Sequence, residues 1–571
     1  MRIGEVISQH LYPAVSRISL IVVIALGAGL FPADALPQVA ARHGMVVASE
    51  PLAAEAGLGI LKAGGNAVDA AVAVGFALAV THPQAGNIGG GGFMLIRLAG
   101  GEAVVVDYRE EAPGAATRNM YLDERGEAIA DASMVGARAA AIPGTVAGLA
   151  LAHKKYGKLP WTRLLQPAIR LASGGFPVSY DLAKSLRSES GLLSRDPESR
   201  RIFLRNGREY EAGEMLRQPQ LAGTLRRIAA SGPRVFYRGA IARAIAATME
   251  KRRGLIRIED LRQYQARLRE PLRGTFRGDE ILSVSPPSSG GVGLIEMLNV
   301  LEPLDLGTPN SFHSIRIIAE TMRRAYADRA AYLGDADFSS VPSHGLTSRA
   351  YAAKLREEIL QSRAEIPVQP GKPLPYESSE TTHFSVVDSA GNAVANTYTL
   401  NGSYGSGVTV EGAGFLLNNE MDDFTTQPGV ANMFGLIQSE ANTIAPRKRP
   451  LSSMTPTIVV HDGKVQLVLG SPGGGTIINT VLQVLLNVLA FKMDIRRAVA
   501  SPRFHHQWMP DQLVLEGWGF SADTIQKLEE AGYKLEYREH MGACEAIEID
   551  TQTGWRFGAA DPRTGGKAVG Y

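Results

Sequence analysis

The segment from residue 376 to residue 407, YESSETTHFSVVDSAGNAVANTYTLNGSYGSG, constrains the fold of this chain more than any other. Residues 383–388 and 393–400 alternate apolar and polar side chains on either side of the turn Ser-Ala-Gly-Asn. This pattern predicts a β-hairpin. Residues 363–380, which are rich in Pro, Ser and Glu, are expected to form an exposed linker ahead of it. The chain therefore changes from a loop to a strand at Thr381.

Other segments predict sheets with helices packed around them. Strands are expected at 45–49, 92–98, 103–109, 456–462 and 465–470, and helices at 52–63, 69–80 and 476–492. The run DAAVAVGFALAV at 69–80 is too short to span a bilayer and is interpreted as a buried helix. These elements favour a layered fold of α/β type without specifying which one.

Charge and composition favour a small molecule as the partner. The 571 residues include 59 Lys and Arg against 57 Asp and Glu, so no basic excess indicates nucleic acid and no acidic excess indicates a solvating tail. An apolar content of 45% is enough for a large core. Glycines cluster in the runs NIGGGGF and SPGGGT, which indicates sites lined by backbone.

The first 35 residues have the pattern of a secretory signal peptide. Arg2 and Arg17 precede the apolar run ISLIVVIALGAGLF, and Ala33-Asp34-Ala35 follows it. The apolar run is shorter than the roughly 20 residues needed to cross a bilayer, so cleavage after Ala35 is preferred to a permanent anchor. The single cysteine, Cys544, cannot form an intrachain disulfide. We therefore expect a periplasmic or secreted protein without a stable membrane span.

Three motifs have plain structural interpretations when each is taken alone. The run NIGGGGFM at 87–94 lacks the Lys-Ser/Thr pair and the strand-to-helix context of a phosphate loop, so close backbone packing is preferred. The adjacent histidines of RFHHQW at 503–508 point in different directions, and neither a metal nor a cofactor is expected. Arg109 ends an apolar strand, where its guanidinium can bind a carboxylate through two hydrogen bonds or form an ordinary surface ion pair.

Thr381 has two interpretations from its position. A threonine hydroxyl is a poor nucleophile without a base, and no G-x-S-x-G signature is present, so it can be an ordinary strand residue. Alternatively, the chain is cut before Thr381. The cut frees an α-amine with a pKa of about 7.7–8.0, which suits a general base near neutrality. Thr381 would then supply both the nucleophile and the base.

Several long motifs occur in one order from about residue 43 to the C-terminus. They are NIGGGGFM, DYREEAP, TTHFSVVDSAGNAVANTYTLN, LLNNEMDDF, RPLSSMTPTIV, GSPGGGTIINTVLQ and PRFHHQW. Together they resemble the γ-glutamyltranspeptidases, which are self-processing N-terminal-nucleophile hydrolases. The resemblance implies an α+β fold, a four-layer αββα sandwich. It also implies a precursor that is cut into a large chain, 36–380, and a small chain, 381–571, which form one intertwined unit.

The resemblance implies one nucleophile for two reactions. The hydroxyl of Thr381 attacks the carbonyl of Glu380, an N-to-O acyl shift gives an ester, and water releases the new N-terminus. The mature Thr381 then attacks the γ-carbonyl of a γ-glutamyl donor such as glutathione. The resulting γ-glutamyl ester is passed to water or to an amino acid or dipeptide acceptor.

The other family roles fall on matching residues. Thr399 resembles the residue that hydrogen-bonds the nucleophile, and the amides of Gly473 and Gly474 resemble an oxyanion hole, the expected device for acyl transfer. The substrate α-carboxylate and α-ammonium require groups of opposite charge. The resemblance assigns the carboxylate to Arg109, Ser452 and Ser453, and the ammonium to Asn401, Glu420 and Asp423.

Residues 428–450 resemble a lid loop. Phe434 stands where many bacterial relatives have a tyrosine, so its ring can cover the site but cannot donate a hydrogen bond. Two alternatives remain besides the γ-glutamyl enzyme. One is a cephalosporin or glutaryl acylase of the same superfamily, whose acyl group lacks the ammonium. The other is an uncleaved periplasmic amino-acid-binding protein, in which Thr381, Thr399 and the glycine pair would have no role.

Overall fold

The computed structural model describes residues 38–362, 364–372 and 382–571. Residues Val39–Tyr571 belong to one folded unit. The predicted signal peptide, and both Glu380 and Thr381 at the predicted cleavage site, lie outside the described residues.

Two seven-stranded sheets stack on each other, and all neighbouring strands within each sheet are antiparallel. The first sheet has the order β1 (Val39–Ala41), β18 (Arg556–Ala559), β17 (Ala546–Ile549), β13 (Lys464–Leu469), β12 (Thr457–His461), β9 (Asp279–Ser283) and β8 (Leu272–Phe276). The second has the order β19 (Lys567–Gly570), β2 (Met45–Ala48), β10 (Thr382–Val387), β11 (Ala393–Thr399), β3 (Gly91–Arg97), β4 (Ala103–Asp107) and β7 (Arg267–Arg269).

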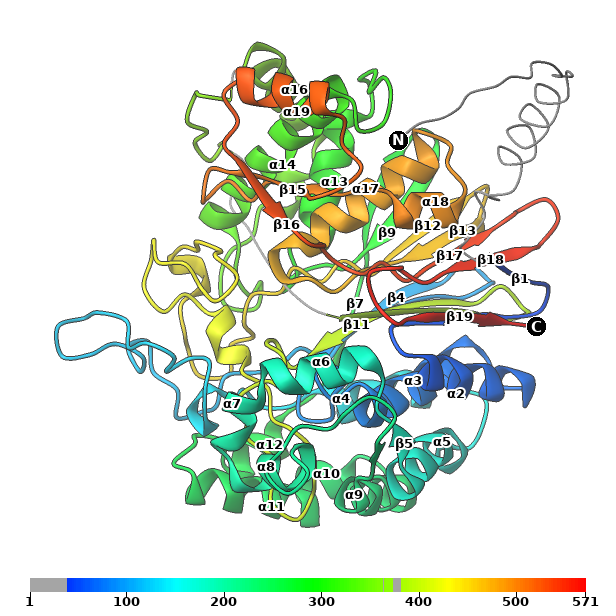
Figure 1. The fold of residues 1–571 in the computed structure, drawn as a ribbon, viewed down its shortest axis with the longest axis vertical. Coiled ribbons are helices and arrows are strands. Elements are labelled where there is room, and N and C mark those ends of the chain that lie inside the picture. Colours follow the sequence, from blue (N-terminus) through cyan, green and yellow to red (C-terminus); the bar gives the residue numbers. More distant parts are fainter. Residues whose placement is uncertain (1–37, 363, 373–381) are drawn as a thin grey trace, which may run out of the picture. The chain divides into compact units, whose positions relative to one another are not determined.

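The central strands are apolar on both faces because both faces are covered. Successive side chains of a strand point to opposite sides. In β2, Val47 therefore packs between the two sheets, whereas Val46 packs against helices. Val468 of β13 lies in the same inter-sheet core, and its neighbour Leu467 packs against the helices of the other side. The two sheets and two helical layers form the predicted αββα sandwich (Figure 1).

Helices cover the outer face of each sheet (Figure 1). Every residue of α3 (Ala67–Thr81) is buried, which confirms the predicted buried helix, and a capping box of Asn66 and Asp69 begins it. The other helices on the side of the second sheet are α2 (Pro51–Lys62), α4 (Thr145–Tyr156), α5 (Trp161–Gly174), α6 (Tyr180–Ser188), α7 (Ser190–Ser194), α8 (Pro197–Phe203), α9 (Pro219–Ser231), α10 (Arg234–Arg238), α11 (Ala240–Lys251) and α12 (Ile258–Gln263).

The first sheet is covered mainly by α13 (Gly290–Leu301), α14 (Phe312–Tyr332), α17 (Ile477–Leu489) and α18 (Ile495–Ala500). The remaining helices are α15 (Ser343–Leu346), α16 (Arg349–Gln361) and α19 (Ala522–Glu530). Short strands form two small sheets, β5 (Phe176–Pro177) with β6 (Met215–Leu216), and β14 (Phe504–His505) with β15 (Leu513–Glu516) and β16 (Leu535–Arg538).

The predicted hairpin is confirmed as β10 and β11. Thr382 faces Tyr398, and Val387 faces Ala393 at the turn. The carboxylate of Asp388 accepts hydrogen bonds from the backbone amides of residues 390 and 392, which fixes the turn. The strand β10 lies between β2 and β11 in the middle of the second sheet. Both sheets therefore combine strands from before and after residue 380.

Residues 364–372, the described part of the linker expected at 363–380, have no regular structure and are mostly exposed, as expected, but hydrogen bonds also tie them to neighbouring elements. Gly371 N donates to Asp328 Oδ1 of α14 at 2.6 Å, and the hydroxyl of Tyr332 donates to Gly371 O at 2.6 Å. Val368 is buried, and its carbonyl accepts a hydrogen bond from Trp508 Nε1 at 2.9 Å. Composition predicted the lack of regular structure but not these contacts, because they depend on groups far away in the sequence.

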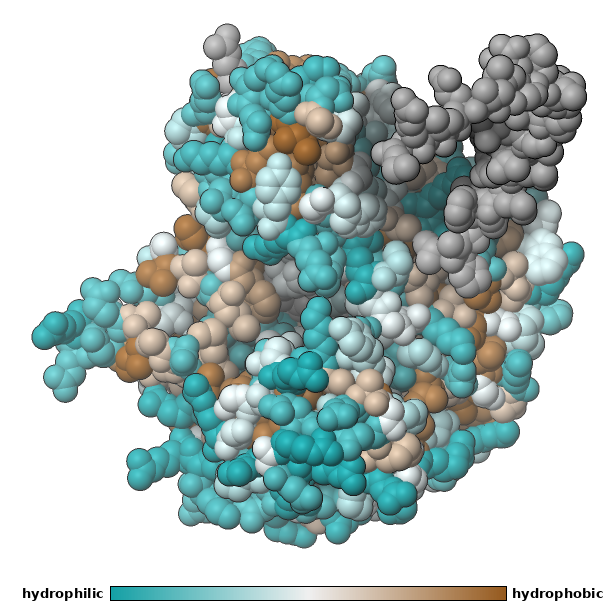
Figure 2. Space-filling model, in the orientation of Figure 1, coloured by the Kyte–Doolittle hydropathy of each residue, from teal (hydrophilic) through white to brown (hydrophobic). Residues whose placement is uncertain are grey.

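The C-terminus closes one edge of the second sheet. The strand β19 pairs with β2, and Tyr571 O accepts hydrogen bonds from the amides of Arg42 and His43 at 3.1 and 2.7 Å. Most of the surface drawn in Figure 2 is hydrophilic, with small brown areas scattered over it, some of them on the left side, where the yellow segment of Figure 1 lies. None of the helices in the described ranges is long and apolar enough to cross a membrane.

Candidate active site

The site begins at the end of the central hairpin. Thr399 is the last residue of β11, and its Oγ1 accepts a hydrogen bond from Asn401 N at 2.8 Å. Asn401 has a positive φ of 73°, and its Nδ2 donates to Asn419 O at 3.1 Å. The strand β10 begins at Thr382, so the chain enters this strand at the same end of the hairpin.

The glycine run at 87–94 lets this end of β11 pack closely against neighbouring backbone. A Cβ atom on Gly90 would lie 1.8 Å from Thr399 O, and one on Gly89 would lie 2.1 Å from Leu416 O. Real Cβ atoms do not approach oxygen so closely. These contacts confirm the packing interpretation of the run, and they show that it supports a predicted site residue directly.

Gly473 and Gly474 follow β13 and turn toward Thr399. Both have positive φ, 133° and 59°, which non-glycine residues rarely adopt. Neither amide donates a hydrogen bond to an acceptor on the described residues. The two N–H groups line the same cavity as Thr399 and can therefore donate to a bound oxyanion.

Arg109 lies two residues after β4 and is fully buried. Its Nη2 forms an ion pair with Asp423 Oδ2 at 2.6 Å, and its Nη1 forms one with Glu420 Oε1. The guanidinium also donates to the carbonyls of Pro450 and Leu451, at 3.1 and 3.0 Å. The groups predicted to bind the two ends of a zwitterion are thus in direct contact with each other. Buried charges need partners, and here the guanidinium pairs with both carboxylates.

Glu110 completes a group that we call the Arg109 cluster, formed by Arg109, Glu110, Glu420 and Asp423. Burial raises the pKa of Glu110 to about 7, although Arg109 lowers it. Burial also raises the pKa of Glu420 well above its ordinary value, and that of Asp423, which Arg109 and the nearby Arg329 partly oppose. One guanidinium cannot neutralise three buried carboxyl groups. An added ammonium group would therefore stabilise their ionised forms.

Ser452 and Ser453 follow the carbonyl groups that hold Arg109. Ser453 Oγ is buried and has no hydrogen-bond partner among the described residues, and the same holds for Glu420 Oε2 and Asn401 Oδ1. Buried polar atoms without partners are costly and rare. The structure therefore brings the predicted substrate-binding residues together and leaves polar atoms of both sets able to bond a ligand.

The predicted lid loop, residues 428–450, is fastened over this cluster. Asn432 Nδ2 donates to Asp423 Oδ1 at 3.3 Å, and Met433 N donates to Asp422 Oδ2 at 3.0 Å. The ring of Phe434 packs on Gly474, where a Cβ atom would lie 2.5 Å from Phe434 Cδ1. The Phe434 ring cannot donate a hydrogen bond, so the lid loop is held in place by the hydrogen bonds of Asn432 and Met433 instead.

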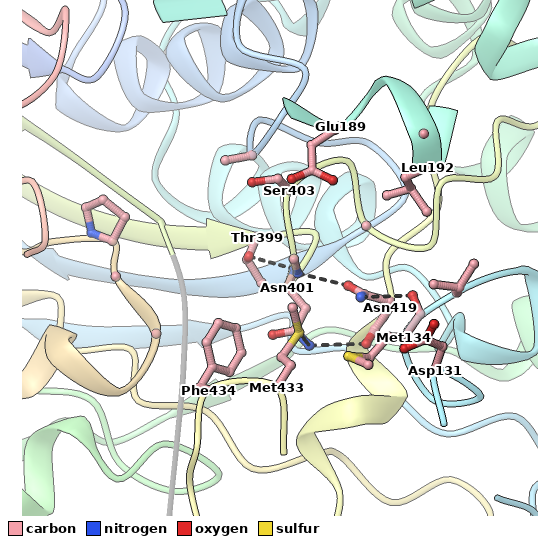
Figure 3. Close-up of a pocket in the computed structure, with 18 of the residues that line it drawn as sticks. Asp131, Met134, Glu189, Leu192, Thr399, Asn401, Ser403, Asn419, Met433 and Phe434 are labelled. Carbon is pink, nitrogen blue, oxygen red and sulfur yellow. Dashed lines mark hydrogen bonds between the residues drawn. The ribbon is translucent and has the colours of Figure 1, made fainter. Parts of the chain in front are cut away.

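A cavity of about 630 Å³ opens above these groups (Figure 3). It is lined by five of the residues singled out in the sequence, Thr399, Asn401, Gly473, Gly474 and Phe434. Other lining residues had not been assigned to the site. Among them, Asp131, Glu189 and Arg195 lie in no motif, whereas Asn419 lies in the motif LLNNEMDDF and Met433 in the predicted lid loop.

The adjacent histidines of the motif at 503–508 have hydrogen-bond partners of their own. His505 contacts Asn479 at 2.8 Å and Gln507 at 2.9 Å, and burial lowers the pKa of His505 to about 3. His506 lies 3.3 Å from Asp511. Across the described ranges, no group of three His, Cys, Asp or Glu side chains is arranged to hold a metal ion.

An αββα sandwich whose central hairpin ends beside paired glycine amides is the architecture of the N-terminal-nucleophile hydrolases. The solved structure of the cephalosporin acylase from Bacillus halodurans matches with a TM-score of 0.85 at 29% identity, covering 95% of this chain and 98% of that one. The family model for γ-glutamyltranspeptidase matches residues 53–571. The chain belongs to the γ-glutamyltranspeptidase family and is an enzyme.

Two curated relatives distinguish branches within this group. The glutathione hydrolase proenzyme of Escherichia coli K12 is 48% identical over 536 residues, covering 93% of this chain and 92% of that protein. The acylase ACY 1 proenzyme of Pseudomonas sp. SE83 is 40% identical over 483 residues, covering 83% and 84%. The glutathione hydrolase has the higher identity of the two.

Proposed function

We propose that this enzyme is a self-processing γ-glutamyltransferase and glutathione hydrolase. The observation that carries the proposal is the Arg109 cluster, in which a buried guanidinium and an excess of carboxyl groups lie side by side. A γ-glutamyl group bears a carboxylate and an ammonium on one carbon, so it matches both sets at once. The identity to a glutathione hydrolase proenzyme supports the same substrate.

The proposed chemistry uses Thr381 twice. Its hydroxyl first attacks the Glu380 carbonyl, and after the acyl shift water hydrolyses the ester, leaving chains 36–380 and 381–571. The new α-amine then accepts the hydroxyl proton as Thr381 attacks the γ-carbonyl of the donor. The amides of Gly473 and Gly474 would stabilise the oxyanion, and Thr399 would orient the nucleophile. The leaving amine takes a proton, and water or an amine acceptor releases the γ-glutamyl group.

The roles of the substrate-binding residues follow from charge. Arg109, with Ser452 and Ser453, would bind the α-carboxylate, since a guanidinium matches a carboxylate in shape and charge. Asn401, Glu420 and Asp423 would bind the α-ammonium. On substrate binding, Arg109 would exchange its protein carboxylates for that of the substrate. Phe434 would cover the site from the lid loop.

A glutaryl acylase is the second candidate, because an acylase structure and an acylase relative both match this chain. A glutaryl group has no ammonium, so binding it would leave Glu420 and Asp423 without a cationic partner beyond arginine. The substrate-binding cluster therefore favours the γ-glutamyl enzyme. An uncleaved binding protein is disfavoured by membership of an enzyme family.

The location proposed is periplasmic or secreted, with residues 1–35 removed as a signal peptide. The pattern of Arg2, the apolar run and Ala33–Ala35 supports this location.

Replacing Thr381 tests the proposal. Thr381→Ala should remain one full-length chain without transfer or hydrolysis of γ-glutamyl-p-nitroanilide, because a methyl group can perform neither attack. Thr381→Ser should still be cut, since it keeps a hydroxyl. Electrophoresis, N-terminal sequencing of the smaller chain, and anilide assays with and without a dipeptide acceptor measure this. Normal two-chain protein from the Ala variant would place the nucleophile elsewhere.

A further inference from the structure

The cavity beside Thr399 extends well beyond the γ-glutamyl-binding residues. One end is formed by Thr399, Asn401, Gly473 and Gly474. The residues proposed to bind the γ-glutamyl α-carbon groups lie beneath this cavity and do not line it, apart from Asn401. With a γ-glutamyl group bound to the Arg109 cluster, the rest of the wall would face the leaving group or the entering acceptor.

Two opposite charges flank a short helix on that far wall. Glu189 directly precedes α7, and Arg195 directly follows it. Both side chains line the cavity, and neither forms an ion pair or hydrogen bond with any described residue. In Figure 3, Glu189 and Leu192 lie on one wall, opposite Phe434 and Met433 across Thr399 and Asn401. Two unpaired charges in a catalytic cavity require an explanation that the γ-glutamyl group does not supply.

The length of α7 selects between possible ligands. Glu189 and Arg195 are six residues apart, so a helical rise of 1.5 Å per residue separates their Cα atoms by about 9 Å. An extended dipeptide spans about 7 Å between its end groups, at 3.3–3.6 Å per residue. A free amino acid carries its ammonium and carboxylate on one carbon, so a dipeptide matches this Cα separation better. The spacing therefore fits the two ends of a short peptide.

We propose that Arg195 binds the terminal carboxylate of the peptide that leaves from the donor or enters as the acceptor, while Glu189 faces its amine end. This inference rests on the proposed γ-glutamyl chemistry and assigns the specificity for the second substrate to α7. Arg195 is exposed and unpaired, so its guanidinium is available to a carboxylate without breaking a protein contact. Its role is recognition, and it takes no part in the bond changes.

Comparing two donors tests Arg195. Glutathione ends in a peptide carboxylate, whereas γ-glutamyl-p-nitroanilide carries the same γ-glutamyl group with no carboxylate on its leaving group. In Arg195→Gln, the KM for glutathione should rise about tenfold, the size expected for a lost charged hydrogen bond. The KM for the anilide should stay within twofold. Arg195→Lys should retain part of the glutathione affinity.

The acceptor gives a second readout in the same variants. With the anilide as donor, the natural enzyme should use glycylglycine better than glycylglycinamide, and Arg195→Gln should lose this preference. Arg187→Gln is the matched control, because Arg187 is an exposed arginine of α6 that does not line the cavity. Equal KM changes for both donors, or none, would overturn the proposal. Failure of the unaltered enzyme to cleave the anilide would instead refute the γ-glutamyl chemistry, and the inference with it.

Discussion

At the scale of single residues, Asp423 separates the two candidate activities. It is a buried partner of Arg109, and it would face the α-ammonium of a γ-glutamyl donor. Truncating one side of such a charge pair typically costs about 2–5 kcal/mol, which is at least about thirtyfold in kcat/KM. Asp423→Asn should therefore reduce kcat/KM for glutathione sharply while sparing self-cleavage.

The ratio of kcat/KM for glutathione to that for a glutaryl amide measures this in both proteins. A glutaryl chain has no ammonium, so the change should relatively favour it. An unchanged ratio would mean that Asp423 does not bind the ammonium and would favour the acylase.

Glu110 should make the stability of the protein depend on pH. Burial raises its pKa from 4.5 to about 7 in the folded state. Between these values the folded protein holds a proton that the unfolded chain has released, so stability should fall as pH rises from about 4.5 to about 7. Glu110→Gln removes this titration. The Tm of this variant should therefore fall less from pH 5 to pH 8 than the Tm of the natural protein does.

Thermal unfolding at both pH values measures the difference, with Glu124→Gln in an exposed loop as the control. The raised pKa values of Glu420 and Asp423 act in the same direction, so part of the slope should remain. Identical pH profiles for the natural protein and Glu110→Gln would contradict the raised pKa of Glu110.

At the scale of elements, the close packing of Gly90, just before β3, against the end of β11 fixes the position of Thr399. Gly90→Ala would place a methyl group 1.8 Å from Thr399 O, so the end of β11 must move. Overpacking of this kind typically costs about 1–3 kcal/mol. We expect slower self-cleavage and loss of most γ-glutamyl activity, with folding retained.

Gly100→Ala is the matched control, because a Cβ atom there meets nothing within 4 Å. Electrophoresis of freshly expressed precursor, together with the anilide assay, measures both variants. Full activity in Gly90→Ala would show that Thr399 tolerates displacement.

The elements were more predictable from the sequence than the site. Alternation and a Gly-Asn turn predicted β10 and β11, and a continuous apolar run predicted α3. The contacts of Arg109 with Glu420 and Asp423 span more than 300 residues, so only the resemblance placed these residues in one pocket. Even then, their direct pairing was not predicted, because a ligand was assumed to separate them. Glu189 and Arg195 had no signal beyond being charged.

At the scale of the whole molecule, cleavage before Thr381 should not separate the two chains. Strand β10 would belong to the small chain, yet it pairs with β2 of the large chain, and each sheet contains strands from both chains. Separation would expose both sheets and the core between them to water. The processed protein should elute from a sizing column as one species at the volume of uncut Thr381→Ala, and give two bands only under denaturing electrophoresis. Two native peaks would contradict the shared sheets.

The pairing of β19 with β2 also bears on aggregation. Every residue of β2 is buried, and β19 covers the hydrogen-bonding edge that β2 would otherwise present to solvent. An apolar strand with an open edge is a template for pairing with other chains. The last five residues therefore move the edge of the sheet from the fully buried β2 to a four-residue strand that begins with an exposed lysine, which is a poorer template for self-association.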